Sequence, residues 1–318
     1  MSKTSLSIHG ILCPTDFSEL AASAFAESVR LARWFGAQVT VVHVVPVTAS
    51  IVGDMGYLPV VSGMDDVVRG ATLRTLQEFV DATEHAGVPV ALACREGNAC
   101  EEIRRLAQET GAGLVVMGTH GRSGFRRLVL GSVTEAVLDH PPVPVLAVNR
   151  KLPQRKGLYA TVLCATDVSK GSARTVAVAL AIAGDGSKRV TVLNVVEHGV
   201  EAFRGSIEQA AVTALHGIIP EEARGVRRID ERVELGEADR EILDVAAEEA
   251  SDLIVMGTRG HGAFGPFFGS TVRSVVRNAT CPVMVVPAGF TWPATELRTK
   301  TVRTKAGHPP AAGHTGAR

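Results

Sequence analysis

The sequence predicts an α/β protein built from two tandem, doubly wound parallel sheets of five strands each, a Rossmann-like arrangement. Three observations predict this fold. Short apolar runs alternate along the chain with longer segments in which apolar residues recur at helical spacing. The runs are apolar throughout, as strands buried on both faces of a parallel sheet are. The same series of motifs also occurs twice along the chain.

In the first copy the expected strands and helices alternate. Gly36 is the expected end of the first helix, because glycine readily adopts the left-handed conformation that closes a helix. Asn98 followed by Glu101 is typical of a capping box at the start of the third helix. The expected strands lie near residues 8–13, 38–45, 89–94, 113–118 and 144–148, and the helices near 18–35, 65–86, 98–110 and 132–140.

The second copy repeats this order. Asp167 corresponds to Asp16 and Gly257 to Gly118, so the second copy is about a dozen residues shorter between these points. Repeats of this length are whole domains rather than solenoid units. The expected strands lie near 160–165, 190–196, 229–234, 252–257 and 282–286, and the helices near 170–183, 203–218, 238–250 and 271–279. We therefore expect domains over residues 1–152 and 153–288, followed by a tail over 289–318.

Two segments fall outside the expected domain cores. Residues 47–64 form a long connection, which could be a lid, a partner contact or an ordered excursion. The tail over 289–318 is basic and rich in small residues and proline. Because such a composition cannot build a core, we expect a disordered, solvated tail, with weak anion contact as the alternative.

Composition narrows the function classes. The chain has 318 residues, with 33 Lys and Arg against 33 Asp and Glu, so no net field draws it to nucleic acid or an anionic membrane. The five cysteines include no CxxC pair, which argues against a disulfide framework and favours a reducing compartment. The first residues lack the apolar core that a signal peptide has, and no apolar run approaches membrane-spanning length. We expect a cytoplasmic protein.

A glycine pattern predicts a nucleotide site. Gly118-Thr119-His120-Gly121 follows an apolar run, and Gly131-Ser132 opens the next expected helix after nine intervening residues. Glycine lets the backbone turn tightly and approach a ligand closely. The free amides and positive dipole end of a helix suit a phosphate. The second copy keeps Gly257, Gly260 and Gly269-Ser270, but its interval between the second and third glycines is one residue shorter.

At these motifs the sequence resembles the universal stress protein family in its tandem two-domain form. The resemblance covers most of 6–150 and 158–288. Its first-copy features are the strand end Pro14-Thr15-Asp16, the strand around Val44, and the run from Met117 to Gly121. Gly131-Ser132-Val133 completes the Gly-x2-Gly-x9-Gly-Ser/Thr signature of the family's nucleotide-binding members.

The resemblance implies a strand order of 3-2-1-4-5 in each sheet and a pseudo-dimer of the two halves packed through their fifth strands. It implies an adenine-nucleotide ligand, ATP or AMP, with any Mg²⁺ held by phosphate oxygens and water. It also implies a regulatory role in the stress response, an unidentified protein partner and a possible homodimer. The implied site residues are Pro14, Thr15, Asp16, Val44, Met117, Gly118, Gly121, Arg122, Gly131, Ser132 and Val133 in the first copy, and Thr166, Asp167, Val195, Gly257, Gly260, Gly269 and Ser270 in the second.

Plainer interpretations stay open. Asp16 could cap the first helix, the loop glycines could be turn residues, and His43 is expected as a packed core residue. The sequence contains no base–nucleophile constellation and no metal-ligand spacing, so we expect neither an enzyme nor a metal site, although slow ATP hydrolysis would not be surprising. The alternative function is an interaction scaffold of the same fold without nucleotide. The shortened second loop leaves nucleotide binding there open.

Overall fold

The computed structural model describes residues 8–47, 66–120, 130–153, 157–169, 171–183, 189–197, 204–224, 228–258 and 269–290. Most of the 47–64 connection and nearly all of the tail expected over 289–318 lie outside these residues.

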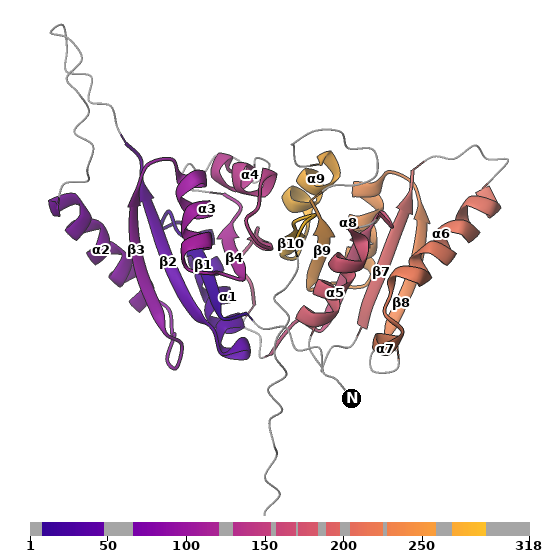
Figure 1. Cartoon of the computed structure of the whole chain (residues 1–318), viewed down its shortest axis with the longest axis horizontal. Helices are drawn as coiled ribbons and strands as arrows, with labels where there is room; N and C mark the ends of the chain where they lie inside the picture. Colours follow the sequence, from indigo (N-terminus) through magenta and orange to yellow (C-terminus); the bar gives the residue numbers. More distant parts are fainter. Residues whose placement is uncertain are drawn as a thin grey trace, which may run out of the picture.

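Strands of both halves join in one ten-stranded sheet, with the order β3-β2-β1-β4-β5-β10-β9-β6-β7-β8 (Figure 1). Each half has the predicted order, since its first strand lies between its second and fourth. The strands are β1 (Gly10–Pro14), β2 (Gln38–Val45), β3 (Val90–Glu96), β4 (Leu114–Gly118), β5 (Val145–Val148), β6 (Thr161–Thr166), β7 (Arg189–Val196), β8 (Ile229–Leu235), β9 (Leu253–Gly257) and β10 (Val283–Val286).

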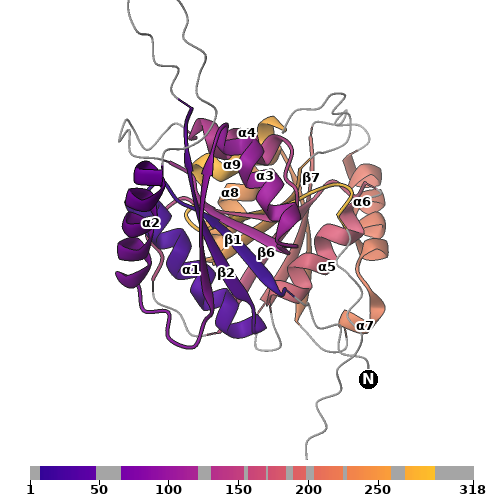
Figure 2. The same cartoon turned by 60° about the vertical axis from the view of Figure 1, so that its left-hand side comes forward.

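Helices cover both faces of the sheet, and each face has its own apolar core. The residues packed beneath α1, α2, α5 and α6 form one core, and those beneath α3, α4, α8 and α9 form the other (Figure 2). The helices are α1 (Glu19–Phe35), α2 (Asp66–Asp81), α3 (Ala99–Glu109), α4 (Ser132–Asp139), α5 (Ser172–Ala183), α6 (Arg204–Ile218), α7 (Glu221–Arg224), α8 (Ala238–Glu248) and α9 (Ser270–Asn278).

Two predicted helix boundaries are confirmed by capping geometry. Gly36 closes α1 in the left-handed region, with φ of 68°. The side chain of Asn98 accepts hydrogen bonds from the amides of Cys100 and Glu101, so it caps α3. The second helix ends at Asp81, earlier than expected, and the single-turn helix α7 was not anticipated.

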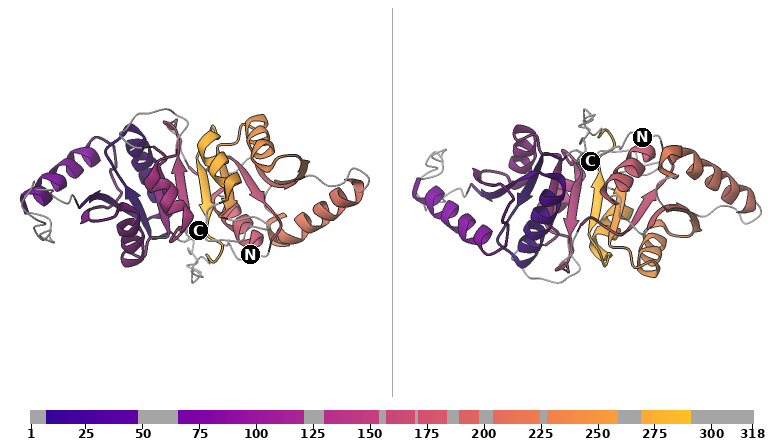
Figure 3. Two further views of the ribbon diagram at one scale, coloured as in Figure 1. Left: turned by 90° about the horizontal axis from the view of Figure 1, so that it is seen from above. Right: turned by 90° about the horizontal axis from the view of Figure 1, so that it is seen from below.

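The two halves meet where β5 and β10 pair antiparallel, with Leu146 opposite Met284. Both strands are fully buried apolar segments. The side-chain amide of Asn149 adds a hydrogen bond to the carbonyl oxygen of Ala279 at 2.6 Å. This pairing turns the two predicted sheets into one continuous sheet, and it places α4 beside α9 at the centre of the molecule (Figures 1 and 3).

A buried polar cluster ties the first half to the segment that precedes β6. Tyr159 is 2% exposed, and its hydroxyl donates to the carboxylate of Glu27 on α1. Arg30 pairs with the same carboxylate, donates to the carbonyl oxygen of Gly157, and lies 4.8 Å from the centre of the Tyr159 ring. Burial, reinforced by the Glu27 carboxylate, raises the pKa of Tyr159. The cluster therefore joins residues more than a hundred positions apart without leaving these groups unpaired.

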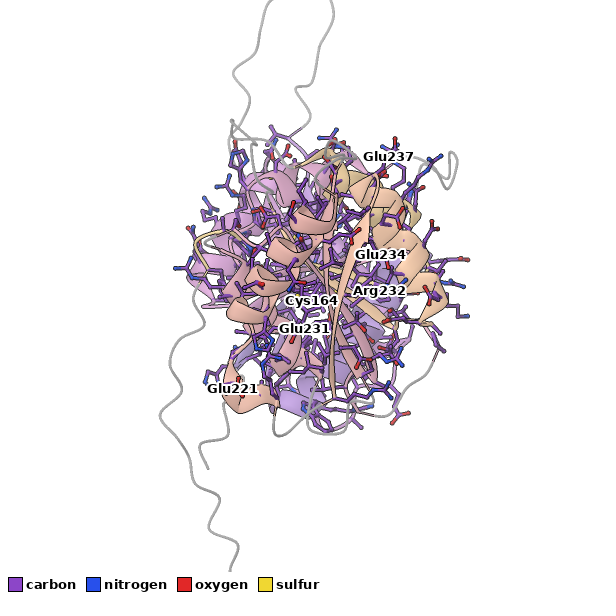
Figure 4. The ribbon with its side chains drawn as sticks, turned by 90° about the vertical axis from the view of Figure 1, so that its right-hand side faces the viewer. Cys164, Glu221, Glu231, Arg232, Glu234 and Glu237 are labelled. Carbon is purple, nitrogen blue, oxygen red and sulfur yellow. The ribbon has the colours of Figure 1, made fainter. Side chains whose placement is uncertain are left out.

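The outer strand β8 carries a ladder of charged side chains (Figure 4). Arg232 donates to Glu234 at 2.5 Å and to Glu248 at 2.8 Å, and Glu231 pairs with Arg224. Charges on an edge strand oppose pairing with the edge of another sheet. Among the described helices, none has both the length and the apolar character that a membrane crossing needs.

Candidate functional site

The carboxyl ends of β1 and β4 lie side by side in the first half. The two strands are paired in parallel, with Leu12 opposite Val115, and β2 pairs with β1 on its other side. The chain passes from β1 to β2 on one side and later returns to β4 on the other, so winding reverses between β1 and β4. Open α/β sheets bind their ligands at such a reversal. Thr15 and Asp16, which follow β1, are therefore brought to the same edge as Gly118, which ends β4.

The β1–α1 loop has a defined conformation. The amide of Phe17 donates to Thr15 Oγ1 at 2.9 Å, and the amide of Ser18 donates to Asp16 Oδ1 at 3.0 Å. Phe17 adopts φ of 67°, which is uncommon for a bulky residue and marks a constrained position. Ser18, rather than Asp16, caps α1, since its hydroxyl oxygen accepts from the amide of Ala21 at 3.2 Å.

The second half repeats the two backbone-to-side-chain hydrogen bonds of this loop. The amide of Val168 donates to Thr166 Oγ1 at 3.2 Å, and the amide of Ser169 donates to Asp167 Oδ1 at 3.1 Å. Val168 takes the place of Phe17 and has φ of 58°. A β-branched residue avoids this region even more strongly. Because two different side chains accept the same rare conformation, the loop shape is a property of the site and not of either residue.

His43 holds this loop in place, a role that its apolar surroundings in the sequence hid. Its Nδ1 lies 2.7 Å from the carbonyl oxygen of Thr15. In the second half Asn194 occupies the equivalent position, and its Nδ2 donates to the carbonyl oxygen of Thr166 at 2.9 Å. Since a carbonyl only accepts, Nδ1 of His43 carries the proton. The sequence did contain one indication of this role. His43 and Asn194 occupy equivalent positions in the two copies, both can donate a hydrogen bond, and both follow an apolar run.

The loop glycines of the first half lie close to the protein's own backbone. A Cβ atom on Gly118 would lie 3.1 Å from the backbone carbon of Leu20 in α1. A Cβ atom on Gly131 would lie 3.1 Å from the carbonyl oxygen of Thr119, to which the Gly131 amide donates at 2.7 Å. Gly131 has φ of −64°, so the reason to favour glycine there is the tight space and not the backbone conformation. The close approach seen at these glycines is to atoms of the protein itself.

These contacts fix the start of α4 beside the end of β4. Gly131 is the N-cap residue and has no side chain to satisfy the first amides of the helix. The hydroxyl of Thr134 donates to the carbonyl oxygen of Gly118 at 2.8 Å, which ties the first turn to the strand. Ser132 and Val133 are exposed. The edge therefore combines a loop held by hydrogen bonds, a carboxylate that can accept hydrogen bonds, and a helix start whose amides are not capped by a side chain. Of these, the helix start suits an anionic group.

The equivalent contact in the second half, between Gly269 and Thr258, is looser. The Gly269 amide lies 3.4 Å from the carbonyl oxygen of Thr258, and a Cβ atom on Gly269 would remain 3.8 Å from that oxygen. Gly269 is again the N-cap residue, with φ of −61°. The second half thus keeps the helix start but lacks the tight contact that Gly131 makes in the first half.

Three of the predicted site residues are buried or partly buried. Met117 is buried in the core beneath α3 and α4, so only its backbone can face a ligand. Val44 and Val195 lie near the carboxyl ends of β2 and β7 and are partly buried. Three predicted residues, Gly121, Arg122 and Gly260, lie outside the described part of the chain.

His120 is part of the same edge and faces the second half. Its Nδ1 lies 2.8 Å from Thr119 Oγ1. Its Nε2 is buried and has no hydrogen-bond partner among the described residues. Burial, with a smaller contribution from the charge of Arg277 on α9, lowers the pKa of His120. His120 is therefore neutral at neutral pH.

The fold and this edge define a doubly wound α/β protein, a class in which ligands commonly bind where the strand order reverses. The profile of the Universal stress protein family matches residues 8–149 and 158–287, more than half of the chain. The chain belongs to the universal stress protein family and contains two of its domains in tandem.

Relatives and solved structures agree with this assignment. A universal stress protein of Mycolicibacterium smegmatis is 26% identical over 293 residues, which cover 87% of this chain and 97% of the relative. Universal stress protein MJ0531 of Methanocaldococcus jannaschii is 30% identical over 141 residues, which cover 44% of this chain and 81% of the relative. The crystal structure of a universal stress protein from Archaeoglobus fulgidus has a TM-score of 0.64 at 24% identity, over 90% of this chain and 98% of that one. The last comparison supports the fold.

Proposed function

We propose that the protein binds an adenine nucleotide in its first half and that occupancy of this site controls a regulatory interaction during stress. The observation that carries the proposal is the juxtaposition of Asp16 with the tightly held start of α4 at Gly131, across the β1–β4 reversal. The carboxylate and the Val44 backbone suit the adenine. The amides of Ser132 and Val133 suit the phosphates.

Mg²⁺ would reach the site with the phosphates. Within the described ranges, no three side chains of the types that bind metals gather in one place. A magnesium ion keeps several waters and takes the rest of its ligands from phosphate oxygens. The proposal therefore includes ATP with or without Mg²⁺, and it includes no catalytic step. The cysteines are thiols in the described structure, which suits the proposed reducing cytoplasm.

Regulation requires the nucleotide to bind two conformations unequally. The β1–α1 loop and the start of α4 come from different elements, so one ligand contacting both would stabilise their present arrangement. A protein partner that recognises this arrangement would then bind the occupied form preferentially.

A second candidate is an interaction scaffold that binds no nucleotide. The looser contact between Gly269 and Thr258 favours this interpretation for the second half. It predicts that the chain has no nucleotide in either half and takes up none.

The matched glycines separate these candidates. The freshly purified full chain is denatured, and the released nucleotide is separated chromatographically and counted. We expect about one per chain in the wild type and in Gly269→Ala, where the added Cβ meets only ordinary contacts. Gly131→Ala should lose the nucleotide, because its Cβ would press against the Thr119 carbonyl.

Other outcomes are equally informative. Two nucleotides per chain would mean that the shortened loop also binds. No nucleotide, together with no uptake of added ATP, would overturn the proposal and leave the scaffold. Circular dichroism of both variants shows whether a loss reflects the site or unfolding.

A further inference from the structure

The outer strands of the ten-stranded sheet, β3 and β8, occupy equivalent places in the two halves. Val90 of β3 pairs with Val39 of β2. Ile229 of β8 pairs with Val190 of β7. Because Val39 and Val190 begin matching strand motifs of the two copies, β3 and β8 align residue by residue. Any difference between them is therefore a difference between equivalent positions of one fold.

The two outer strands differ in the charge of their central residues. The three central positions are Ala91, Leu92 and Ala93 in β3, and Asp230, Glu231 and Arg232 in β8. Each of the three charged residues of β8 forms an ion pair. Charged side chains on an outer strand oppose its pairing with another sheet. The centre of β8 therefore has this protection, whereas the centre of β3 consists of uncharged side chains.

Alternate residues of β3 direct their backbone groups away from β2. The carbonyl oxygen of Pro89 accepts from the amide of Val39 at 2.9 Å. The amide of Gly97 donates to the carbonyl oxygen of Val45 at 3.0 Å. The odd-numbered residues from 89 to 97 thus face β2, and the even-numbered residues between them face outward, since the direction alternates along a strand. This outer edge presents both donors and acceptors.

The side chains beside this edge leave room for another strand. Leu92 packs against the core beneath α2, and Ala93 packs against the core beneath α3. Ala91 is exposed and small. Arg95 is drawn towards α3, where it forms an ion pair with Glu109. The middle of β3 therefore combines an outward-facing backbone with short or already packed side chains.

We propose that β3 pairs antiparallel with β3 of a second copy of the chain, which joins two ten-stranded sheets edge to edge. When the seven residues of β3 are aligned over their full length, Val90 lies opposite Glu96 of the second copy. Ala91 then lies opposite Arg95 of the second copy, and the two Ala93 residues face each other on the two-fold axis. No pair in this register brings two charged side chains together. Such a contact uses the same surface of both copies and closes as a dimer.

The same alignment of β8 with itself is unfavourable. Antiparallel pairing over Ile229–Leu235 would place Arg232 opposite Arg232 and Asp230 opposite Glu234. Like charges directly opposite each other destabilise a strand pair. Pairing of β3 with β8 of another copy would leave one outer strand of each copy open, so it would continue into a filament. Pairing of β3 with itself is thus the closed arrangement that the charges permit.

The junction between the two halves already uses a contact of this kind. There β5 and β10 pair antiparallel, and each of these strands has four residues. The proposed contact would use seven residues from each copy. It lies at the far end of the first half from β5, so it would add a second copy without disturbing the junction (Figure 1).

The sign of an added charge tests the proposed register. Sedimentation of the full chain over a concentration series measures the dissociation constant of the dimer. Ala91→Lys should raise this constant about tenfold, because symmetry creates the repulsion with Arg95 twice. Ala91→Glu should lower it, since an opposite charge then faces Arg95. Ala214→Lys, an exposed position on α6 at the other end of the molecule, should leave it unchanged.

Cysteine cross-linking tests the same register by distance. In a Cys100→Ser background, Ala93→Cys should form a disulfide-linked dimer on mild oxidation. Directly opposite residues in such a pair have Cα atoms about 4.5 Å apart, which a disulfide can span. Ala91→Cys is the matched control and should stay unlinked, because the two copies of residue 91 would lie about 13 Å apart along the strands.

Four results would overturn the proposal. One is a chain that stays monomeric at its highest soluble concentration. Another is an equal effect of Ala91→Lys and Ala91→Glu on the dissociation constant, with both variants folded by circular dichroism. A third is cross-linking through Ala91→Cys as readily as through Ala93→Cys. The fourth is assembly that continues beyond the dimer, which would indicate pairing of β3 with β8 instead.

Discussion

Glu135 and Arg273 occupy equivalent positions in the two halves, have opposite charges, and form an ion pair across the junction of α4 and α9. In an assembly of two identical domains these positions would carry the same charge. Like charges at this distance repel, whereas the tandem chain pairs one of each sign. The duplicated domains have therefore diverged so that each half complements the other.

Charge reversal tests this complementarity. Glu135→Arg should lower the free energy of unfolding by about 0.5–1 kcal/mol, since partly exposed ion pairs contribute little and the reversal adds repulsion. The double variant Glu135→Arg with Arg273→Glu should recover most of this loss in urea unfolding. If the double variant is as unstable as the sum of the single variants, the two side chains do not interact.

His43 should tolerate only residues that donate a hydrogen bond. We expect His43→Asn to keep both stability and nucleotide content, because Asn194 performs the same task in the second half. His43→Leu should cost about 1 kcal/mol and reduce nucleotide content, since the Thr15 carbonyl loses its donor. Thermal unfolding and nucleotide counting measure the two effects. Equal behaviour of the two variants would contradict the role assigned to this hydrogen bond.

Gly118 and Gly10 allow the steric effect of an added Cβ atom to be compared at a tight and a less tight position. A Cβ on Gly118 would lie 3.1 Å from the α1 backbone, whereas on Gly10 the nearest contact is 3.6 Å, from Ala112 Cα. We expect Gly118→Ala to destabilise the protein by about 1–3 kcal/mol through overpacking. Gly10→Ala should cost clearly less in the same urea titration. A larger cost at Gly10 would show that the contact between β4 and α1 does not limit the size of residue 118.

The thiols should differ in reactivity. Burial raises the pKa of Cys13 and of Cys164 to about 12, so both remain protonated thiols at pH 8, whereas Cys100 is partly exposed. A colorimetric thiol reagent should therefore modify Cys100 first, and Cys13 and Cys164 only on unfolding. Mass spectrometry of the labelled peptides identifies the order.

The same shifts predict how stability depends on pH. A thiol whose pKa is raised by folding favours the folded state below its unfolded value of 9.0. That contribution is lost as the pH rises from 9.0 toward about 12. Urea unfolding across this range should show falling stability, less steeply in a Cys13→Ala variant. Rising stability would contradict the assignment.

Much of the fold could be predicted from local patterns. Alternating apolar and helical segments placed every long element within a few residues of its position, and Gly36 and Asn98 marked real helix boundaries. The glycine pattern correctly located the start of α4. These features depend on backbone conformation and burial over a few neighbouring residues, which periodicity reports directly.

The site was only partly predictable. Asp16 and Gly118 were expected at one edge, but His43 was expected only as a core residue. Its hydrogen bond to the Thr15 carbonyl depends on how β2 lies against β1. No local sequence pattern indicates the relative position of the two strands. The left-handed conformation of Phe17 was hidden for the same reason, since nothing in its own residue type favours it.

By itself, the sequence determined the repeat, the alternation of elements and the family, because each is recorded in residue types at short spacing. Only the tertiary structure decided that the two sheets join at β5 and β10, that Glu135 meets Arg273, and that the charge of Arg277 reaches His120. Those relationships link residues more than a hundred positions apart. The packing of the whole chain decides which of these residues come close together. Hydrogen bonds and ion pairs form only between groups that are close.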